Sequence, residues 1–296
     1  MPPEILRHLR CPLCGQPLAP VPPGAASGAT ALRCPAGHSF DVARQGYVNL
    51  TVGRAPHSGD TAAMVAARDE FLGAGHYDLI STTLAELATT PAAPATGPAD
   101  GARTAYPELV VDAGAGTGWH LAAVLDALPG ATGLALDVSK PALRRAARAH
   151  PRAGAVLCDT WRRLPLADGA ADLVLNVFAP RNGAEFRRVL HPRGRLLVVT
   201  PAADHLRELV DALALLRVDP AKEERVADSL TPYFTPGPVT IRRDTLRLTR
   251  AEVRTLVGMG PSAWHTAPEP LDARIDALSE PVTVTAAVRI AVYRPR

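Results

Sequence analysis

The stretch Val110-Val111-Asp112-Ala113-Gly114-Ala115-Gly116-Thr117-Gly118 decides the fold of this chain. An apolar run leads into it and a helical pattern follows it, which predicts a tight turn from a strand into a helix. Its glycines recur at every second position, and an acidic residue stands two positions before the first of them. A dinucleotide-binding loop would have its third glycine at position 119, where Trp119 would crowd a pyrophosphate. The loop therefore predicts a cofactor site of another kind.

The segments around this loop predict an α/β fold. From Glu108 onward, short apolar runs alternate with helical patterns, which is typical of a parallel sheet wound by helices. Helices are expected from about residues 119, 140, 183 and 204, and the alternating segment from Val282 to Tyr293 is expected to be a last, edge strand of a hairpin. The sequence thus predicts a doubly wound, mostly parallel sheet. Its other strands are expected at Leu109–Val111, Leu134–Leu136, Ala155–Leu157, Leu173–Leu175 and Leu196–Val199.

The spacing of the glycines resembles the first motif of the Rossmann-like, class I methyltransferases. The resemblance implies that the backbone at Gly114, Gly116 and Gly118 approaches the methionyl part of S-adenosylmethionine. It also implies that Asp112 helps to hold the ammonium group of this cofactor, directly or through water.

Two further carboxylates end the next two predicted strands. Asp137 lies nineteen residues after the last glycine of the loop, where a carboxylate can accept hydrogen bonds from both ribose hydroxyls. An alternative role for Asp137 is a helix cap, because Ser139-Lys140-Pro141 opens a helix directly after it. Asp159 ends the third strand and is placed to meet the adenine amine. We therefore expect both acids to bind the cofactor.

Three cysteines and one histidine form a metal-binding pattern near the N-terminus. Cys11 and Cys14 make a C-x2-C turn, and Cys34 and His38 follow after nineteen residues as C-x3-H. Two such turns facing each other supply the four ligands of a tetrahedral zinc ion and leave no open position, so we expect a structural site. A module of about fifty residues buries too little surface to fold without a metal. Cys158 is expected to be an ordinary core thiol.

Composition divides the 296 residues into three parts. Residues 1–50 are expected to form the zinc ribbon, which would recognise RNA. Residues 51–104 are expected to form two helices and a flexible linker, which is the low-complexity segment from residue 89 onward. Residues 105–296 are expected to form the methyltransferase domain.

Charge and hydropathy limit the other classes of protein. The net charge of +3 permits nucleic-acid binding but does not argue for it. No run of eighteen apolar residues is present, and the start Met-Pro-Pro-Glu lacks the features of a signal peptide. We therefore expect a cytoplasmic protein that does not cross a membrane.

The motifs taken together resemble the 23S rRNA guanine-N1 methyltransferases, and more closely their Gram-positive, tylosin-resistance branch. The similarity covers essentially the full length, and only the linker at residues 89–104 looks longer than in relatives. Besides the metal-binding pattern and the glycine loop, it rests on Phe40–Leu50, Gly59–Tyr77, Leu136–Lys140, Phe178–Pro180, Thr200–Leu206 and Gly260–Trp264.

This resemblance implies a substrate, an assembly and further site residues. The target is a guanine in a 23S rRNA hairpin that lines the peptide exit tunnel, and its methylation contributes to resistance against macrolides such as tylosin. The assembly is a homodimer that shapes a cleft for this hairpin. The resemblance adds Tyr77, His120, Leu121 and His205 as cofactor contacts. The sequence pattern alone would make Tyr77 a core residue and would place His120 in the first turn of a helix.

Guanine N1 carries a proton at neutral pH, so an enzyme must aim N1 at the methyl group and accept or release that proton. Asn176 could accept it or grip the guanine edge, and Phe178 could stack on the base, although both could simply finish the sheet. Asp60 and Asp204 are further candidates for a base. Positioning and the charge of the cofactor could also suffice, so no single catalytic residue is assigned.

Arginines are the expected RNA contacts, because the chain has only two lysines. The three beside the metal-binding pattern, Arg33, Arg44 and Arg54, are the better candidates. The remaining clusters could equally be a solvated surface: they are Arg144, Arg145, Arg148, Arg152, Arg162, Arg163, Arg187 and Arg188.

Two other functions fit parts of the sequence. A small-molecule methyltransferase, for example one of natural-product synthesis, would share the cofactor motifs but would not need a metal ribbon. A non-catalytic RNA-binding protein would not need intact glycines, Asp112 and Asp137. A steep decrease of substrate affinity with salt would favour RNA over a small molecule.

Overall fold

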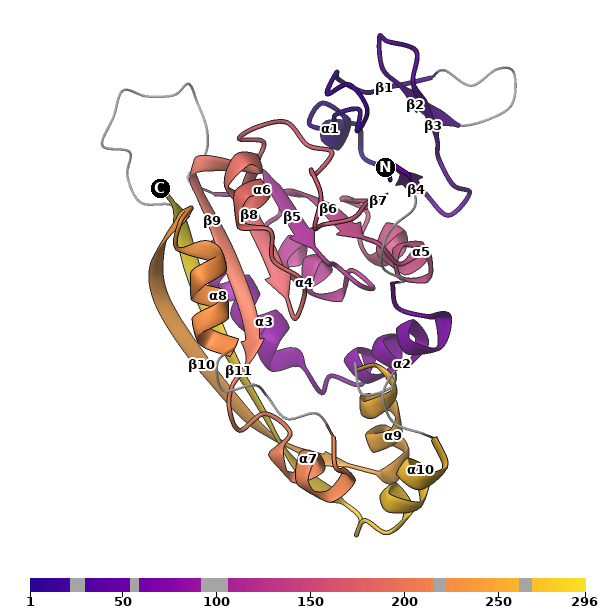
Figure 1. Cartoon of the computed structure of the whole chain (residues 1–296), viewed down its shortest axis with the longest axis vertical. Helices are drawn as coiled ribbons and strands as arrows, with labels where there is room; N and C mark the ends of the chain where they lie inside the picture. Colours follow the sequence, from indigo (N-terminus) through magenta and orange to yellow (C-terminus); the bar gives the residue numbers. More distant parts are fainter. Residues whose placement is uncertain (22–29, 54–58, 92–105, 216–221, 261–267) are drawn as a thin grey trace.

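The computed structural model describes residues 1–21, 30–53, 59–91, 106–215, 222–260 and 268–296 (Figure 1). Most of the predicted linker, Arg54 and most of the Gly260–Trp264 motif lie outside these ranges.

A single eight-stranded sheet organises the chain in the order β10-β11-β9-β8-β5-β6-β7-β4 (Figure 1). Neighbouring strands are parallel from β4 to β9, whereas β11 is antiparallel to both β9 and β10. This confirms the predicted doubly wound, mostly parallel sheet. The strands are β4 (Tyr47–Asn49), β5 (Leu109–Ala113), β6 (Thr132–Asp137), β7 (Ala153–Leu157), β8 (Ala171–Val177), β9 (Leu190–Pro201), β10 (Phe234–Leu248) and β11 (Val282–Pro295).

The prediction that the last strand lies at an edge is wrong. Strand β11 lies between β9 and β10, and it is buried at most positions. Strand β10 is the edge, and most of its residues are exposed. An edge strand needs little apolar surface, and two prolines, Pro236 and Pro238, interrupt this one, so its sequence lacks the usual signal of a strand.

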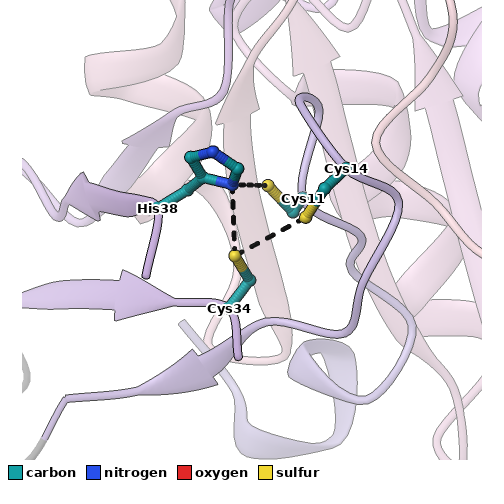
Figure 2. Close-up of side chains that lie close together, drawn as sticks. All are labelled: Cys11, Cys14, Cys34 and His38. Carbon is teal, nitrogen blue, oxygen red and sulfur yellow. Dashed lines mark hydrogen bonds between the residues drawn. The ribbon is translucent and has the colours of Figure 1, made fainter. Parts of the chain in front are cut away.

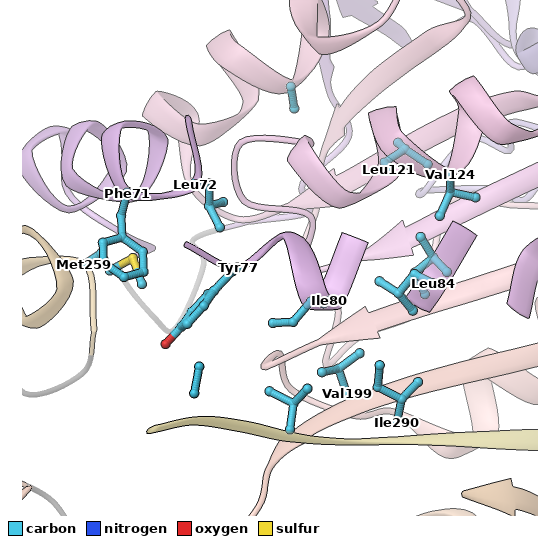
Figure 3. Close-up of a cluster of buried hydrophobic side chains, with 14 of the residues drawn as sticks. Phe71, Leu72, Tyr77, Ile80, Leu84, Leu121, Val124, Val199, Met259 and Ile290 are labelled. Carbon is cyan, nitrogen blue, oxygen red and sulfur yellow. The ribbon is translucent and has the colours of Figure 1, made fainter. Parts of the chain in front are cut away.

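Two hydrophobic clusters cover the two faces of the sheet. On one face, helices α2, α3, α4, α5 and α9 pack over alternating strand residues, as the cluster around Leu84, Leu121 and Val199 illustrates (Figure 3). Helices α1, α6 and α8 pack on the other face. The helices are α1 (Pro3–Leu6), α2 (Ala62–Gly73), α3 (Asp78–Thr89), α4 (Trp119–Ala127), α5 (Lys140–Ala149), α6 (Gly183–Val189), α7 (Arg207–Leu213), α8 (Lys222–Leu230), α9 (Arg250–Gly258) and α10 (Pro268–Asp276).

Local sequence signals begin the helices near the site. Thr61 caps α2 by accepting a hydrogen bond from the amide of Met64 at 3.2 Å, and Ser139 caps α5 in the same way. Thr249 and Glu252 form a complete capping box at the start of α9. Helix α2 is one of the two helices expected within residues 51–104, and it buries an apolar stripe of Met64, Val65, Phe71 and Leu72.

The N-terminal ribbon is joined to the sheet rather than merely tethered to it. Its own three-stranded sheet consists of β1 (Ala19–Pro20), β2 (Ala31–Arg33) and β3 (Ser39–Asp41). The next strand, β4, then pairs with β7 and becomes the last strand of the large sheet. Leu9 is fully buried and forms a bridge with Leu166. The expected boundary at residue 50 therefore follows a strand that the ribbon segment contributes to the other module.

Candidate functional site

The four predicted metal ligands converge at one point between the two turns of the ribbon (Figure 2). Their donor atoms all lie within 4.8 Å of one another. Nδ1 of His38 is 3.5 Å from Sγ of Cys11 and 3.4 Å from Sγ of Cys34, and Sγ of Cys34 is 3.6 Å from that of Cys14. Zinc–sulfur bonds of about 2.3 Å in a tetrahedron place the ligand atoms roughly 3.7 Å apart, so these three distances fit a bound zinc ion.

The glycine loop joins β5 to α4 at the carboxyl end of the sheet, where the strand order reverses. Gly114, Gly116 and Gly118 have φ angles of +87°, +54° and +78°, which disfavour any other residue. A Cβ atom at Gly114 would also collide with Cβ of Ala179, which follows β8. Gly114 is half-buried, whereas Gly116 and Gly118 are buried, and a Cβ atom at Gly118 would come within 3.1 Å of Ala146 in α5. We call the loop Gly114–Gly118 the cradle, because only glycine fits its tight turn and close packing.

Asp112 lies beneath this cradle and lacks a partner for one of its oxygens. Its side chain is 1% exposed, and its Oδ1 has no hydrogen bond within the described part of the chain. Burial and the nearby charge of Asp137 raise the pKa of Asp112 to about 8. A buried carboxylate of this kind needs a cation, and the ammonium group of S-adenosylmethionine would supply one.

Asp137 is the last residue of β6, and Asp159 lies two residues after the end of β7. Both lie at the carboxyl end of the parallel strands, where the glycine loop also lies. Asp137 accepts hydrogen bonds from the amides of Gly116 at 2.8 Å and Ser139 at 2.7 Å. The capping role that was an alternative for Asp137 belongs to Ser139 instead. Asp159 is 9% exposed, and its Oδ1 accepts a hydrogen bond from the amide of Trp161 at 3.0 Å. Three carboxylates thus lie at or just beyond the carboxyl ends of the neighbouring strands β5, β6 and β7, as cofactor binding requires.

Tyr77, Phe178 and His205 form an aromatic group beside the loop. Oη of Tyr77 is 3.3 Å from Nε2 of His205, and the rings of Phe178 and His205 are 6.0 Å apart. Nδ1 of His205 accepts a hydrogen bond from the amide of Ala287, so the ring is a neutral tautomer with its proton on Nε2. Phe178 is 44% exposed and has a φ angle of +51°, a strained conformation that directs the chain away from β8.

The other two cofactor contacts that the resemblance implied face α3 and the core. His120 is hydrogen-bonded to Ser81, at 2.9 Å between Nδ1 and Oγ. Burial, and then the positive charge of Arg68, lower the pKa of His120 to about 4, so its ring is neutral. Leu121 is 1% exposed and belongs to the core (Figure 3).

Asn176 lies inside the fold and not on an accessible surface. It is fully buried, and its Nδ2 donates to the carbonyls of Ala113 at 3.1 Å and Pro180 at 2.8 Å. It thereby joins the end of β5 to the loop that carries Phe178. A catalytic role for Asn176 stays a prediction, and its contacts are those of a residue that positions the loop.

The two candidate bases are both paired with arginines. Asp60 is bonded to Arg68, and Oδ2 of Asp204 is 2.8 Å from Nε of Arg243. The hydrogen bond from Arg243 lowers the pKa of Asp204. Within the described ranges, no hydrogen bond or ion pair joins Asp60 or Asp204 to Asn176, and the catalytic roles of these residues stay predictions.

Arg68 is a residue of the site that the sequence pattern did not single out. Its guanidinium lies over the glycine loop, because a Cβ atom at Gly116 would be 3.4 Å from its Nη1. It also donates to Asp60 and, at 2.9 Å, to the carbonyl of Met259. Arg68 thus connects α2, the end of α9 and the loop. Arg68 lies within the Gly59–Tyr77 stretch that resembles the family, but no local sequence pattern indicates its contact with Met259, 191 positions away.

Several arginines that were candidates for either an RNA-binding or a solvated surface make contacts within the fold. Arg152 donates to three carbonyls at the end of α4 and after it, and Arg188 is paired with Glu185 and Asp168. Arg145 is paired with Asp69. Among the candidate arginines that the structure describes, the exposed ones include Arg33, Arg44, Arg144, Arg148, Arg162 and Arg163.

The sheet, the cradle with its carboxylates and the closed metal centre define the class of the protein. The chain is a class I, S-adenosylmethionine-dependent methyltransferase with a structural zinc ribbon at its N-terminus. A family model for the N-terminal zinc ribbon of RlmA matches residues 9–52, and a methyltransferase-domain model matches residues 110–194.

Two relatives match the whole chain. The 23S rRNA (guanine(748)-N(1))-methyltransferase of Streptomyces fradiae is 49% identical over 292 residues, which cover 99% of this chain and 98% of the relative. A protein of Micromonospora griseorubida, provisionally named 23S rRNA (guanine-N(1)-)-methyltransferase, is 69% identical over 297 residues and covers both chains in full. The chain therefore belongs to the family of the 23S rRNA (guanine-N1)-methyltransferases, as its motifs predicted.

Proposed function

We propose that this enzyme transfers the methyl group of S-adenosylmethionine to N1 of one guanine in a 23S rRNA hairpin at the peptide exit tunnel. The observation that carries the proposal is end-to-end identity of 49% with a relative named for this reaction at guanine 748. The match includes both the metal-holding ribbon and the cofactor cradle, so it extends beyond the parts that any methyltransferase would share.

The residues of the chain support this reaction by binding and orientation. The glycine cradle and the three carboxylates, Asp112, Asp137 and Asp159, fit the methionyl, ribose and adenine parts of the cofactor. The bound cofactor supplies an electrophilic methyl group on a positively charged sulfur. The rings of Tyr77 and Phe178, whose centroids are 6.4 Å apart, would border the place where a base meets the cofactor. Orientation of N1 toward the methyl group then provides much of the rate.

We extend the proposal to the assembly and the biological role. A homodimer would present two ribbons and two catalytic domains to one hairpin. Methylation of the exit tunnel would contribute to resistance against tylosin-type macrolides, and a ribosomal RNA substrate implies that the enzyme works in the cytoplasm. Within the described ranges, every helix is too short or too polar to span a bilayer.

The proposal is tested by methyl transfer to RNA. Purified enzyme and labelled S-adenosylmethionine are incubated with 23S rRNA that lacks the modification, and with 16S rRNA as a control. We expect about one methyl group per 23S rRNA and none in 16S rRNA. Absence of label in 23S rRNA, with tight cofactor binding retained, would contradict the proposal and would favour a small-molecule substrate.

A further inference from the structure

Trp161 is a large aromatic side chain that the fold leaves in solvent. It is 55% exposed, and no ring contact in the described part of the chain involves it. It lies two residues after Asp159, in the loop that leaves β7 at the edge of the cofactor site. The side chain thus presents apolar surface to solvent beside the cofactor site, where an external partner can cover it.

The loop that carries Trp161 is held in place along its length. The amide of Trp161 is bonded to Asp159, and Nδ2 of Asn182 is 3.3, 3.0 and 3.3 Å from the carbonyls of Thr160, Trp161 and Arg162. Further along, Leu164 is bonded to Glu185 through its amide and to Arg188 through its carbonyl. The ring is therefore exposed on a fixed backbone, and its exposure does not come from a loose loop.

The same loop runs from the cofactor site to the zinc ribbon. Nη1 of Arg162 donates to the carbonyl of Val52 at 3.0 Å, and the amide of Arg10 donates to the carbonyl of Pro165 at 3.0 Å. A cavity of about 310 Å³ lies between the loop and the first metal-binding turn, and Arg10, Pro12, Gly15, Arg163 and Asp168 are among its lining residues. Trp161 thus stands between the two places that the substrate must reach.

We propose that the ring of Trp161 stacks on an unpaired nucleobase of the RNA hairpin, next to the guanine that enters the cofactor site. This inference rests on the proposed function, because that function supplies the RNA. An exposed indole offers a flat apolar face to a base, and the exposed Arg163 on the same loop complements a phosphate beside it. The guanidinium of Arg162 is already engaged by the carbonyl of Val52 and the carboxylate of Asp159.

The test compares hairpin binding by full-length variants that are saturated with S-adenosylhomocysteine. Trp161→Ala should weaken binding of the synthetic 23S rRNA hairpin roughly ten- to a hundredfold, because it removes one stacked base. It should raise KM for RNA more than it changes kcat, and S-adenosylhomocysteine affinity should stay constant. Trp161→Phe should restore most of the loss. Tyr106→Ala is the matched control, because Tyr106 is 52% exposed and precedes β5, at the amino end of the parallel strands and away from the cofactor site.

Salt separates stacking from charge. The effect of Trp161→Ala should be the same at low and high salt, whereas that of Arg163→Gln should shrink as salt rises. Wild-type hairpin affinity in Trp161→Ala would overturn the inference, and so would an equal loss of S-adenosylhomocysteine binding, since the ring would then only support Asp159. A wild-type enzyme that bound no hairpin would refute the proposed function itself, and this inference with it.

Discussion

The zinc centre and the cofactor cradle solve the problem of binding a charged group in different ways. All four donors of the zinc centre come from residues 11–38, and they already face one another across less than 5 Å (Figure 2). The cradle instead combines a loop at residues 112–118 with residues from α2, from the ends of β6 and β7 and from beyond β9. Its key carboxylate, Asp112, is buried without a full set of partners.

This difference shows where each site obtains its stability. The ribbon shares its buried residues with the large sheet and has little core of its own, so metal binding should supply much of the free energy that folds it. The cradle lies on a large sheet whose two hydrophobic clusters can support the cost of a buried carboxylate. Loss of a ligand should therefore unfold the ribbon, whereas loss of a cradle contact should impair binding in a folded protein.

The largest effect is expected when the metal is lost. Cys34→Ser should abolish stoichiometric zinc and weaken hairpin binding more than about a hundredfold, because a structural zinc contributes roughly 10 kcal/mol or more to such modules. Affinity for S-adenosylhomocysteine should fall less than tenfold. Zinc analysis and titrations with the hairpin and with S-adenosylhomocysteine check this result. Full hairpin affinity without metal would show that the zinc does not support RNA binding.

Gly114→Ala should be the most damaging single change in the cradle. The φ angle of +87° costs a non-glycine residue about 1–2 kcal/mol, and the added Cβ would meet Ala179. We expect a lower Tm and at least a tenfold loss of cofactor affinity, with zinc retained. Gly130→Ala is the control, because open space surrounds that position. Equal behaviour of the two variants in calorimetry would contradict the proposed geometry.

The cofactor affinity should depend on pH through Asp112. Because its pKa is raised to about 8, the free protein must release a proton before the carboxylate can meet the ammonium group. Affinity for S-adenosylhomocysteine should therefore rise as pH increases from 6 to about 8 and then level off.

Stability of the cofactor-free protein should change in the opposite sense. A carboxyl group whose pKa is raised by folding stabilises the folded state at low pH, and this contribution is lost as pH rises through the folded value of about 8. Asp112→Asn should remove both pH dependences, raise Tm above pH 8 and bind cofactor at least tenfold more weakly. An unchanged pH profile in Asp112→Asn would show that another group titrates.

The smallest effect is expected at the aromatic group. Tyr77→Phe removes the hydrogen bond to His205 but keeps the packing of the ring, so it should cost about 1 kcal/mol. Cofactor affinity should fall severalfold, and hairpin affinity measured without cofactor should stay constant. A change in hairpin affinity alone would show that Tyr77 contributes to RNA binding and not to cofactor binding.

The two sites also differ in how far the sequence alone predicts them. The metal ligands follow from local spacing, and the glycine loop with Asp137 and Asp159 follows from the order of strands, so the structure places them as expected. Contacts between distant segments leave no local pattern. Examples are Arg68 with Met259, the pairing of β4 with β7, and the exposed edge strand β10 beside β11. The exposure of Trp161 also depends on a loop fixed from α6, which spacing alone does not reveal.

The most direct test of the account maps the methylated base. The 23S rRNA that has been treated with wild-type enzyme and S-adenosylmethionine serves as the template for primer extension, since a methyl group on guanine N1 blocks base pairing and stops the polymerase. The proposed function predicts one new stop, at a single guanine of the exit-tunnel hairpin, and no stop with Cys34→Ser at the same concentration. Stops at many guanines, or a stop at full strength with the zinc-free variant, would contradict it.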